Sequence, residues 1–454
     1  MIYAVGRHAH LFAELASHFH SLRNFWPLPE SKRMNIALIS LLALIVAILI
    51  SGFSRLNVGI LSISFAWIIG YYLAGMTTAT ILDAFPLGLA TILFGITFLF
   101  SQAQLNGTLD KVVKIAILLA RGNRGLIPLI FFLLAVVLAS IGPGNIGAVA
   151  LLAPLAMAAA GKVGISAFLM TVMVANGANA GAFSPLAPTG IIANGLTRQL
   201  GLTMDPWSQI YLPSLLAQSF VALVSYVIFG GVKLWKADGA HSSDIEEVIG
   251  KREPFNRAQW LTLASIVALI AGVMVFKIDP GYLSITLACV LSLLGAADQE
   301  SAIKAVPWNT IMMVCGVSVL ISILQTTGGM DLFTSLLASV ATVGNVTGVI
   351  AFVTGLISAY SSSSGVVMPA FIPIVPSLIA KLGGGSPVAL VSSINVGSHL
   401  VDVSPLSTLG ALCIANAAAH EDRNLLFRHL LMYGLSMAVI GAFVCYIFFG
   451  LLMR

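Results

Sequence analysis

Residues 184–194 read SPLAPTGIIAN, and residues 404–416 read SPLSTLGALCIAN. Each copy places a serine and a proline inside a long apolar stretch, after NGANAGAF in the first case and NVGSHLVDV in the second. Helix-breaking polar backbone is tolerated at membrane depth only where protein buries it or where it lines a cavity. Two such breaks at matching positions of two halves predict a binding site inside the membrane.

The composition is that of a polytopic membrane protein. Of the 454 residues, 58% are hydrophobic and 9% are charged, whereas a soluble domain has about 25% charged residues. The sequence has no GxxxxGK[ST] loop and no HExxH motif, which argues against an ATP-driven pump and a zinc protease. We expect neither an enzyme nor a nucleic-acid-binding protein, and no cofactor other than a coupling sodium ion. The cysteines lack metal-ligand spacing and are interpreted as packing residues: Cys289, Cys315, Cys413 and Cys445.

Five apolar runs of bilayer-spanning length occur in each half. They are 35–53, 57–75, 85–104, 163–197 and 207–231, then 260–276, 280–296, 307–327, 386–417 and 427–452. The fourth run of each half carries the break. Before it lies a longer segment, 125–160 or 346–381, that small polar residues interrupt. We predict that both segments are re-entrant hairpins, with tips at Gly142-Pro143-Gly144-Asn145 and at Ser361 to Gly365.

The two halves align with almost no gaps. Ser184 matches Ser404 at an offset of 220, and Gln104 matches Gln325 at an offset of 221. A nearly constant offset over such a length indicates internal duplication. Because a re-entrant hairpin does not cross the bilayer, each half has an odd number of spans, and the repeats must be inverted. The expected fold is an all-α polytopic membrane protein with repeat 1 at 34–235, a linker at 236–257 and repeat 2 at 258–454.

The Lys and Arg positions set the orientation. If residue 35 starts outside, fourteen of them fall in inner loops and four in outer positions, which are Arg198, Lys277, Lys381 and Arg454. We therefore expect a bacterial inner-membrane protein with a cytoplasmic linker. The first hairpin would open from the cytoplasm and the second from outside.

Three further segments have an interfacial character. Residues 1–33 carry four basic residues but no signal-peptide core, and they are either an interfacial helix or an extension upstream of a start at Met34. The basic amphipathic stretch 109–121 and its counterpart 331–343 predict helices at the membrane surface.

The breaks suit a small anion. Serine is a good N-cap and proline suits the first helical position, so Ser184-Pro185 and Ser404-Pro405 predict new helix starts near the bilayer midplane. Such a start presents free N–H groups and a positive dipole end. We expect the preceding NGANAG and NVGSH stretches to be unwound and to offer carbonyls to a cation. No Lys or Arg lies in the middle of a span. The alternative is that the Ser-Pro pairs only kink packed helices.

His399 and Asp402 are the ionisable residues deep in an apolar span. Such residues are functional candidates, and their spacing places them on one helix face. Asp402 would bind a cation or carry a proton, and His399 would sense pH or contact substrate. Alternatively, Asp402 caps the half-helix after it and His399 is its hydrogen-bond partner. Asn179 and Ala182 occupy the aligned positions of the first half.

The candidate site residues follow from these features. Asn145, at the first tip, is the strongest polar candidate, with a turn-closing role as its alternative; the serines of the second tip are candidates unless they form only a flexible turn. For substrate we predict Gly144, Asn145, Ser184, Pro185, Thr189, Ser363, Ser364, Gly365, Ser404, Pro405 and Thr408. For a coupling cation we predict Asn145, Asn176, Asn179, Ser362, Asn395, His399 and Asp402.

The first half resembles the MatC family of malonate and dicarboxylate carriers, within the ion transporter superfamily that includes the divalent anion/sodium symporters. The resemblance rests on AQLNGTLD (103–110), RGNRGLIP (121–128), GPGNIGAVALLAP (142–154) and NGANAGAFSPLAPTG (176–190). It implies a homodimer with a scaffold and a mobile domain that works by elevator-type alternating access. Sodium/dicarboxylate relatives carry Ser-Asn-Thr at each tip, whereas this chain has Pro143-Gly144-Asn145 and Ser363-Ser364-Gly365.

These features favour a secondary carrier of small carboxylates, coupled to sodium or protons. A second hypothesis keeps the architecture and makes the protein a cation/proton antiporter or an arsenite-type exporter, with Asp402 as the exchanged-ion site. A membrane-embedded enzyme or assembly subunit is the third class. Against it, the sequence shows no paired carboxylates and no Ser/His/Asp set within the membrane.

Overall fold

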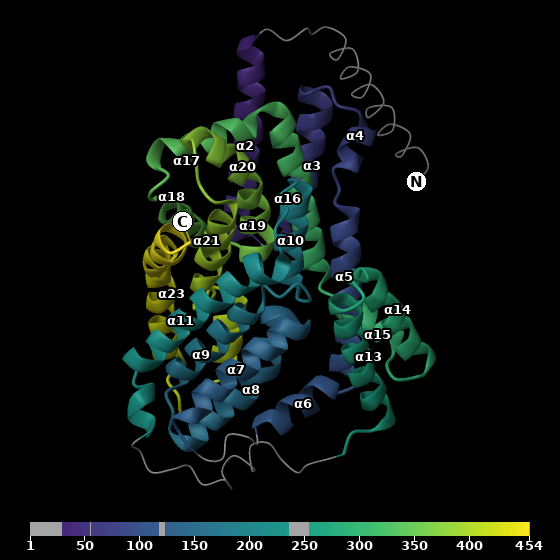
Figure 1. The fold of residues 1–454 in the computed structure, drawn as a ribbon, viewed down its shortest axis with the longest axis vertical. Helices are drawn as coiled ribbons and strands as arrows, with labels where there is room; N and C mark the ends of the chain where they lie inside the picture. The colour runs from purple at the N-terminus through teal and green to yellow at the C-terminus, as the bar shows by residue number, and fades with distance from the viewer. Residues whose placement is uncertain (1–29, 55, 118–122, 236–253, 454) are drawn as a thin grey trace, which may run out of the picture.

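The computed structural model describes residues 30–54, 56–117, 123–235 and 254–453, which form helices and no strands. Figure 1 shows these helices in an elongated arrangement. The prediction for residues 1–33 falls outside this description except for residues 30–33, which begin a helix. The end of the amphipathic stretch 109–121 and most of the linker also lie outside it.

The two halves repeat one order of helices. The first half contains α2 (Glu30–Phe53), α3 (Val58–Trp67), η1 (Ile68–Leu73), α4 (Thr78–Asp83), α5 (Leu87–Leu105), α6 (Thr108–Ile117), α7 (Leu126–Ile141), α8 (Gly144–Val163), α9 (Ala167–Gly181), α10 (Pro188–Gln199), η3 (Pro206–Tyr211), α11 (Leu212–Ile228) and η4 (Gly231–Trp235). The second contains α13 (Arg257–Met274), α14 (Pro280–Leu293), α15 (Gln299–Ala305), α16 (Trp308–Thr327), α17 (Gly329–Val340), α18 (Val346–Ser358), η5 (Ser363–Val367), α19 (Met368–Phe371), η6 (Ile372–Ile374), α20 (Val375–Leu382), α21 (Pro387–Leu400), η7 (Val401–Val403), α22 (Thr408–Ala415), α23 (Arg423–Cys445) and η8 (Tyr446–Leu451).

The helices are long and apolar enough for a multi-pass membrane protein. Eight helical stretches within the described residues have the length and composition to cross a bilayer. Three of the ten predicted spans contain shorter apolar helices, at Met34–Ile50, Val58–Leu73 and Pro280–Leu293. The predicted span at 163–197 is divided by its break into α9 and α10.

Side-chain caps fix where several helices begin. Asn57 accepts the amides of Gly59 and Ile60 at the start of α3. Asn256 forms a capping box with Gln259 at the start of α13. Asp279 caps α14, which is the counterpart of α3 in the second half. These polar residues satisfy amides that a helix start leaves without partners.

One group of helices is held together by glycine contacts between the halves. We call α2, α3, α5, α13, α14 and α16 the glycine-paired bundle; α3 packs against α16, and α14 packs against α5. A Cβ on Gly316 would overlap the backbone of Gly59, and a Cβ on Gly95 would overlap the Gly281 carbonyl oxygen. Small residues let membrane helices approach this closely. The α3–α16 pair and the α5–α14 pair are therefore held by the same kind of glycine-to-glycine contact.

The remaining long helices form the hairpin bundle, which we define as α7, α8, α9, α11, α18, α21 and α23. Here α7 packs against α9, and α18 packs against α21. A Cβ on Gly177 would lie 2.5 Å from the Phe132 carbonyl oxygen, and one on Gly397 would lie 2.6 Å from the Ala351 Cα. Each broken helix therefore packs closely against the first helix of the hairpin in its own half. In Figure 1 the α7, α8 and α9 ribbons lie side by side.

The hairpin tips differ in their backbone. The first turns at Gly142 and Pro143, where Gly142 has φ 147° and Gly144 has φ 69°. A side chain at Gly142 would also overlap the Phe100 ring of α5, so glycine is required there for two reasons. The second tip has a longer turn at residues 359–362, and η5 begins at Ser363.

Candidate functional site

Both broken helices turn in the same way. The Ser184 hydroxyl accepts the Leu186 amide at 3.3 Å, and the Ser404 hydroxyl accepts the Leu406 amide at 3.3 Å. A Cβ on Gly190 would overlap the Ser184 carbonyl oxygen, and one on Gly410 would overlap the Ser404 carbonyl oxygen. The repeated SPL phrase therefore encodes one local structure, used twice.

The new helices begin later than predicted. We expected them at Ser184-Pro185 and at Ser404-Pro405, but α10 begins at Pro188 and α22 begins at Thr408. The reason is that each serine carbonyl oxygen accepts the amide three residues ahead, from Ala187 at 2.9 Å and from Ser407 at 3.0 Å, which closes an isolated turn before the helix begins. Free helix-start amides are therefore displaced toward the second half of each broken helix.

The polar stretches before the breaks are helical, so the prediction that they are unwound is wrong. Residues 176–181 belong to α9, and residues 395–399 belong to α21. The gap that the breaks create is confined to residues 182–187 and 404–407. Because a helix uses its carbonyls internally, these stretches contribute side chains to the site.

Both hairpin tips and the second break line one cavity of about 260 Å³. Six predicted site residues meet there: Asn145, Ser362, Ser363, Ser364, Asp402 and Thr408. The other residues that line it are Ile146, Met313, Ser358, Ala359, Tyr360, Ser361, Leu406, Ser407 and Leu409. The lining thus combines hydroxyl, amide and carboxylate groups with an apolar wall.

Asn145 fastens the first tip to both broken helices. Its Nδ2 donates to the Asn179 Oδ1 at 2.9 Å, and the Asn179 Nδ2 donates to the His399 carbonyl oxygen at 2.8 Å. The Asn145 Oδ1 accepts the Ile146 amide at 3.0 Å. All three polar side chains are buried. This chain of bonds joins α8, α9 and α21 beside the cavity.

Asp402 fastens the second tip to the second break. The Ser363 hydroxyl donates to the Asp402 Oδ1 at 2.7 Å, and the Ser407 hydroxyl also interacts with this carboxylate. The Ser358 and Ser363 hydroxyl oxygens lie 2.5 Å apart. Asp402 is 6% exposed and lies in η7, immediately before the break. Its partners are Ser363 of the tip and Ser407 of the break, and the alternative in which His399 is its hydrogen-bond partner is not seen among the described residues.

His399 is buried near the end of α21, three residues before Asp402. Its Nδ1 is 2.9 Å from the Asn395 carbonyl oxygen and 3.0 Å from the Ser398 hydroxyl. Its ring packs edge-to-face on Phe183, with centroids 4.8 Å apart. The Nε2 is buried and has no hydrogen-bond partner among the described residues. His399 thus links the two breaks by packing, because Phe183 directly precedes Ser184.

Several predicted residues lie outside this cavity. Ser184 and Thr189 are buried in the first broken helix, at 0% and 2% exposure. Asn176 donates to the Tyr433 hydroxyl at 3.2 Å, and both amide atoms of Asn395 are buried without partners in the described part of the chain. Four more residues flank the cavity in sequence but are absent from its lining: Gly144, Gly365, Ser404 and Pro405.

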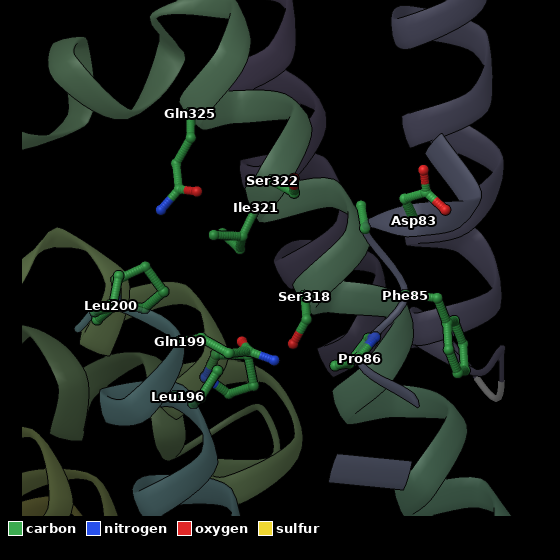
Figure 2. Close-up of a pocket in the computed structure, with 13 residues that line it drawn as sticks. Asp83, Phe85, Pro86, Leu196, Gln199, Leu200, Ser318, Ile321, Ser322 and Gln325 are labelled. Carbon is green, nitrogen blue, oxygen red and sulfur yellow. The ribbon is translucent and has the colours of Figure 1, made fainter. Parts of the chain in front are cut away.

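Other cavities border α10. One, of about 640 Å³, has Pro185 in its wall. Arg198 and Lys277 also line it, and both are basic residues that we predicted on the outer side of the membrane. The second, of about 300 Å³, lies between α10, α16 and the loop before α5. Figure 2 shows Gln199, Ser318 and Gln325 around its interior. Gln325, which the internal repeat pairs with Gln104, therefore lines a cavity.

Sequence reasoning missed Ser407 and Met313. Ser407 carried a usable signal, because the second copy reads SPLS where the first reads SPLA. Met313 lies in an unbroken apolar run of α16 and reaches the cavity only through the packing of that helix. Apolar residues in such a run look alike in the sequence.

The lining offers oxygen ligands and hydrogen-bond donors. Within the described residues, no group of three or more His, Cys, Asp or Glu side chains could hold a metal ion. The Asp402 carboxylate and the serine hydroxyls of the second tip are the hard oxygen ligands that sodium-like cations accept. The hydroxyl and amide donors suit an anion. No Lys or Arg is among the residues that line this cavity.

The described residues form a helical multi-pass membrane protein with a polar cavity between two hairpin tips and a broken helix. Residues 34–182 match the family described as the N-terminus of the dicarboxylate carrier protein MatC. The resemblance noted from the sequence is thereby confirmed over that part of the chain.

A solved structure shows the same fold over nearly the whole length. It is MtrF of Neisseria gonorrhoeae, whose description places it in a class of antimetabolite efflux pumps; the two chains share 12% identity at a TM-score of 0.55, over 96% of this chain and 98% of that one. No curated protein sequence matches the chain.

Proposed function

We propose that this protein is a secondary active transporter of small carboxylates, such as malonate or another C3–C4 dicarboxylate. The observation that supports it most is the cavity where two hairpin tips and a broken helix converge. Intramembrane helix ends at a repeat interface are where such carriers bind their cargo. The family match over residues 34–182 supports the carboxylate class.

The cavity would hold an anion without a basic side chain. Its donors are the hydroxyls of Ser362, Ser364 and Thr408, because Ser363 and Ser407 bond to the Asp402 carboxylate. The first amides of α22 lack partners within their own helix and carry its positive dipole end. Away from water, such fixed donors stabilise a carboxylate far better than they would in solution.

Asp402 supports coupled transport. It is the only acidic residue that lines the cavity, and an ionised carboxylate repels a dicarboxylate at short range. A sodium ion beside Asp402, or a proton on it, would remove this repulsion. We therefore propose symport with sodium or protons, in which the cation binds first at Asp402 and the second-tip serines.

We further propose inverted repeats and elevator-type movement in a homodimer of the bacterial inner membrane. Loops that the charge count places on one side do contact each other: the Asn57 Nδ2 donates to the Asn309 Oδ1 at 2.6 Å, and the Asn106 Nδ2 donates to the Ala296 carbonyl at 3.2 Å. On the other side, Thr327 donates to Ser40 at 2.8 Å. These contacts support the proposed topology.

The proposal is tested in proteoliposomes that contain the purified protein. Labelled malonate and succinate should accumulate under an inward sodium or proton gradient and should not accumulate without one. A thermal-shift titration with and without sodium complements this assay, because a bound ligand stabilises the folded protein by mass action. Absence of carboxylate uptake under every gradient would refute the proposal.

A second candidate function is cation/proton antiport or arsenite-type export. Asp402 is again the observation that favours it, as a single buried carboxylate beside a cavity. In that case Asp402→Asn would abolish ion exchange, and carboxylates would never compete with the transported ion.

A further inference from the structure

We call the cavity of about 260 Å³ that both hairpin tips and the second break line the tip cavity. Part of its wall comes from a helix outside the hairpin bundle. Met313, on α16, is the only lining residue that belongs to the glycine-paired bundle. All others come from α8, from the second hairpin and its tip, or from the second broken helix. Met313 therefore faces any bound anion from a different part of the fold than the groups that would bind its carboxylates.

Met313 packs directly on the second tip. A Cβ added to Gly365 would overlap the Met313 sulfur and would lie 3.0 Å from its Cγ. The same added atom would lie 2.8 Å from the Ser362 hydroxyl oxygen. The thioether thus lies against the tip backbone, next to the serines that line the cavity.

The backbone beneath Met313 cannot retreat. On the other side of α16, a Cβ on Gly59 would overlap the Met312 carbonyl oxygen and would lie 2.5 Å from the Met313 Cα. The α3 backbone therefore supports α16 at this point. Because close-packed interiors transmit changes in volume, the length of the side chain at 313 controls how far the wall reaches into the cavity.

We infer that Met313 is a specificity-determining residue that limits the chain length of the transported carboxylate. This inference rests on the proposed function. A dicarboxylate has polar ends and an apolar middle, and the cavity lining combines serine and threonine hydroxyls with apolar side chains such as Met313 and Leu409. The flexible, polarisable thioether suits contact with methylene groups, and its bulk excludes longer chains.

The repeat supplies a matched control position. Ile92 of α5 corresponds to Met313 (313 − 221 = 92) and lines the 640 Å³ cavity beside Pro185. A substitution at Ile92 shortens a side chain at the equivalent point of the other half without touching the tip cavity.

The test is competition against labelled malonate uptake by dicarboxylates of three to six carbons. In Met313→Ala, the potency of five- and six-carbon acids relative to malonate should rise at least about tenfold, or about 1.4 kcal/mol. Met313→Leu, which nearly conserves volume, and Ile92→Ala should keep the wild-type order. Gly365→Ala should push the thioether into the cavity and weaken uptake, and Met313→Ala/Gly365→Ala should restore it.

The outcomes separate the two proposals. No carboxylate uptake by the wild-type protein overturns the proposed function and this inference together. Uptake by an active Met313→Ala variant with an unchanged chain-length order overturns only the role of Met313. If Met313→Ala does not yield folded protein, Met313→Val shortens the side chain less, and the Gly365→Ala profile tests the same wall from the tip side.

Discussion

The two broken helices share a backbone turn but have different surroundings. Leu186 after the first serine is 3% exposed, whereas Leu406 after the second is 51% exposed. The helix after the first break, α10, packs on α5, where a Cβ on Gly195 would lie 2.9 Å from the Leu89 side chain. The second break instead borders the tip cavity.

For the hairpins the packing is reversed: it is mainly the second hairpin that packs on the glycine-paired bundle. The second hairpin shares its hydrophobic core with the glycine-paired bundle, through residues such as Val366 and Phe371. The first hairpin has its core within the hairpin bundle, through Phe131 and Leu152. Two copies of one sequence pattern are thus docked differently. Under the proposed elevator movement, this asymmetry corresponds to a cavity open on one side, and the opposite state would expose the first break.

The shared turn predicts the largest effect. Gly190→Ala and Gly410→Ala each place a Cβ on the serine carbonyl oxygen of their own break. Overpacking of this kind costs about 1–3 kcal/mol or more, so both variants should lose most of their folded protein in detergent, measured by size-exclusion fluorescence. Gly88→Ala, which meets nothing within 4 Å, is the control. If only one of the two variants is impaired, the breaks do not share the turn.

The asymmetry in charge predicts the next effect. Asp402 has Ala182 at the aligned position, so coupling should depend on the second break alone. Asp402→Asn should lower gradient-driven uptake at least about tenfold, or about 1.4 kcal/mol, measured in proteoliposomes. The exposed Asp331→Asn is the charge-matched control. Unchanged uptake and cation dependence in Asp402→Asn would exclude this residue from coupling.

The difference in exposure can be measured directly. In a Cys289→Ser background, which removes the exposed native thiol, Leu406→Cys and Leu186→Cys place thiols at matching positions. A polar thiol reagent should modify the first on the order of tenfold faster, because a thiol reacts only where the reagent reaches it. Substrate that fills the cavity should slow this reaction at position 406. Equal rates would contradict the asymmetry.

The smallest effect concerns two matching threonines. Thr408 lines the cavity, and Thr189 is buried in the first broken helix. Thr408→Val should raise the KM for carboxylate about fivefold, equivalent to one hydrogen bond of about 1 kcal/mol. Thr189→Val should leave the KM unchanged. The comparison fails if the two variants shift the KM equally.

Much of the candidate site could be predicted, because polar residues are conspicuous in an apolar chain. Asn145, Asp402 and the serines of the second tip were identified from the sequence and line the cavity. The helix starts were placed too early, because a Ser-Pro pair can begin an isolated turn as well as a helix, and each serine carbonyl here accepts the amide three residues ahead. Ser184 and Thr189 were predicted to bind substrate as part of the first SPL phrase, and their burial shows that local sequence does not determine what packs against it.

The sequence by itself determined the membrane class and the positions of the tips and breaks, because hydropathy, glycine and proline act locally along the chain. Only the tertiary structure decided which break borders a cavity and which lies buried. It also brought Met313 from a distant helix to the second tip. These outcomes depend on which helices dock, and helix docking in a membrane follows close packing between whole surfaces. The two SPL phrases are therefore alike in the backbone they form and unlike in what they face.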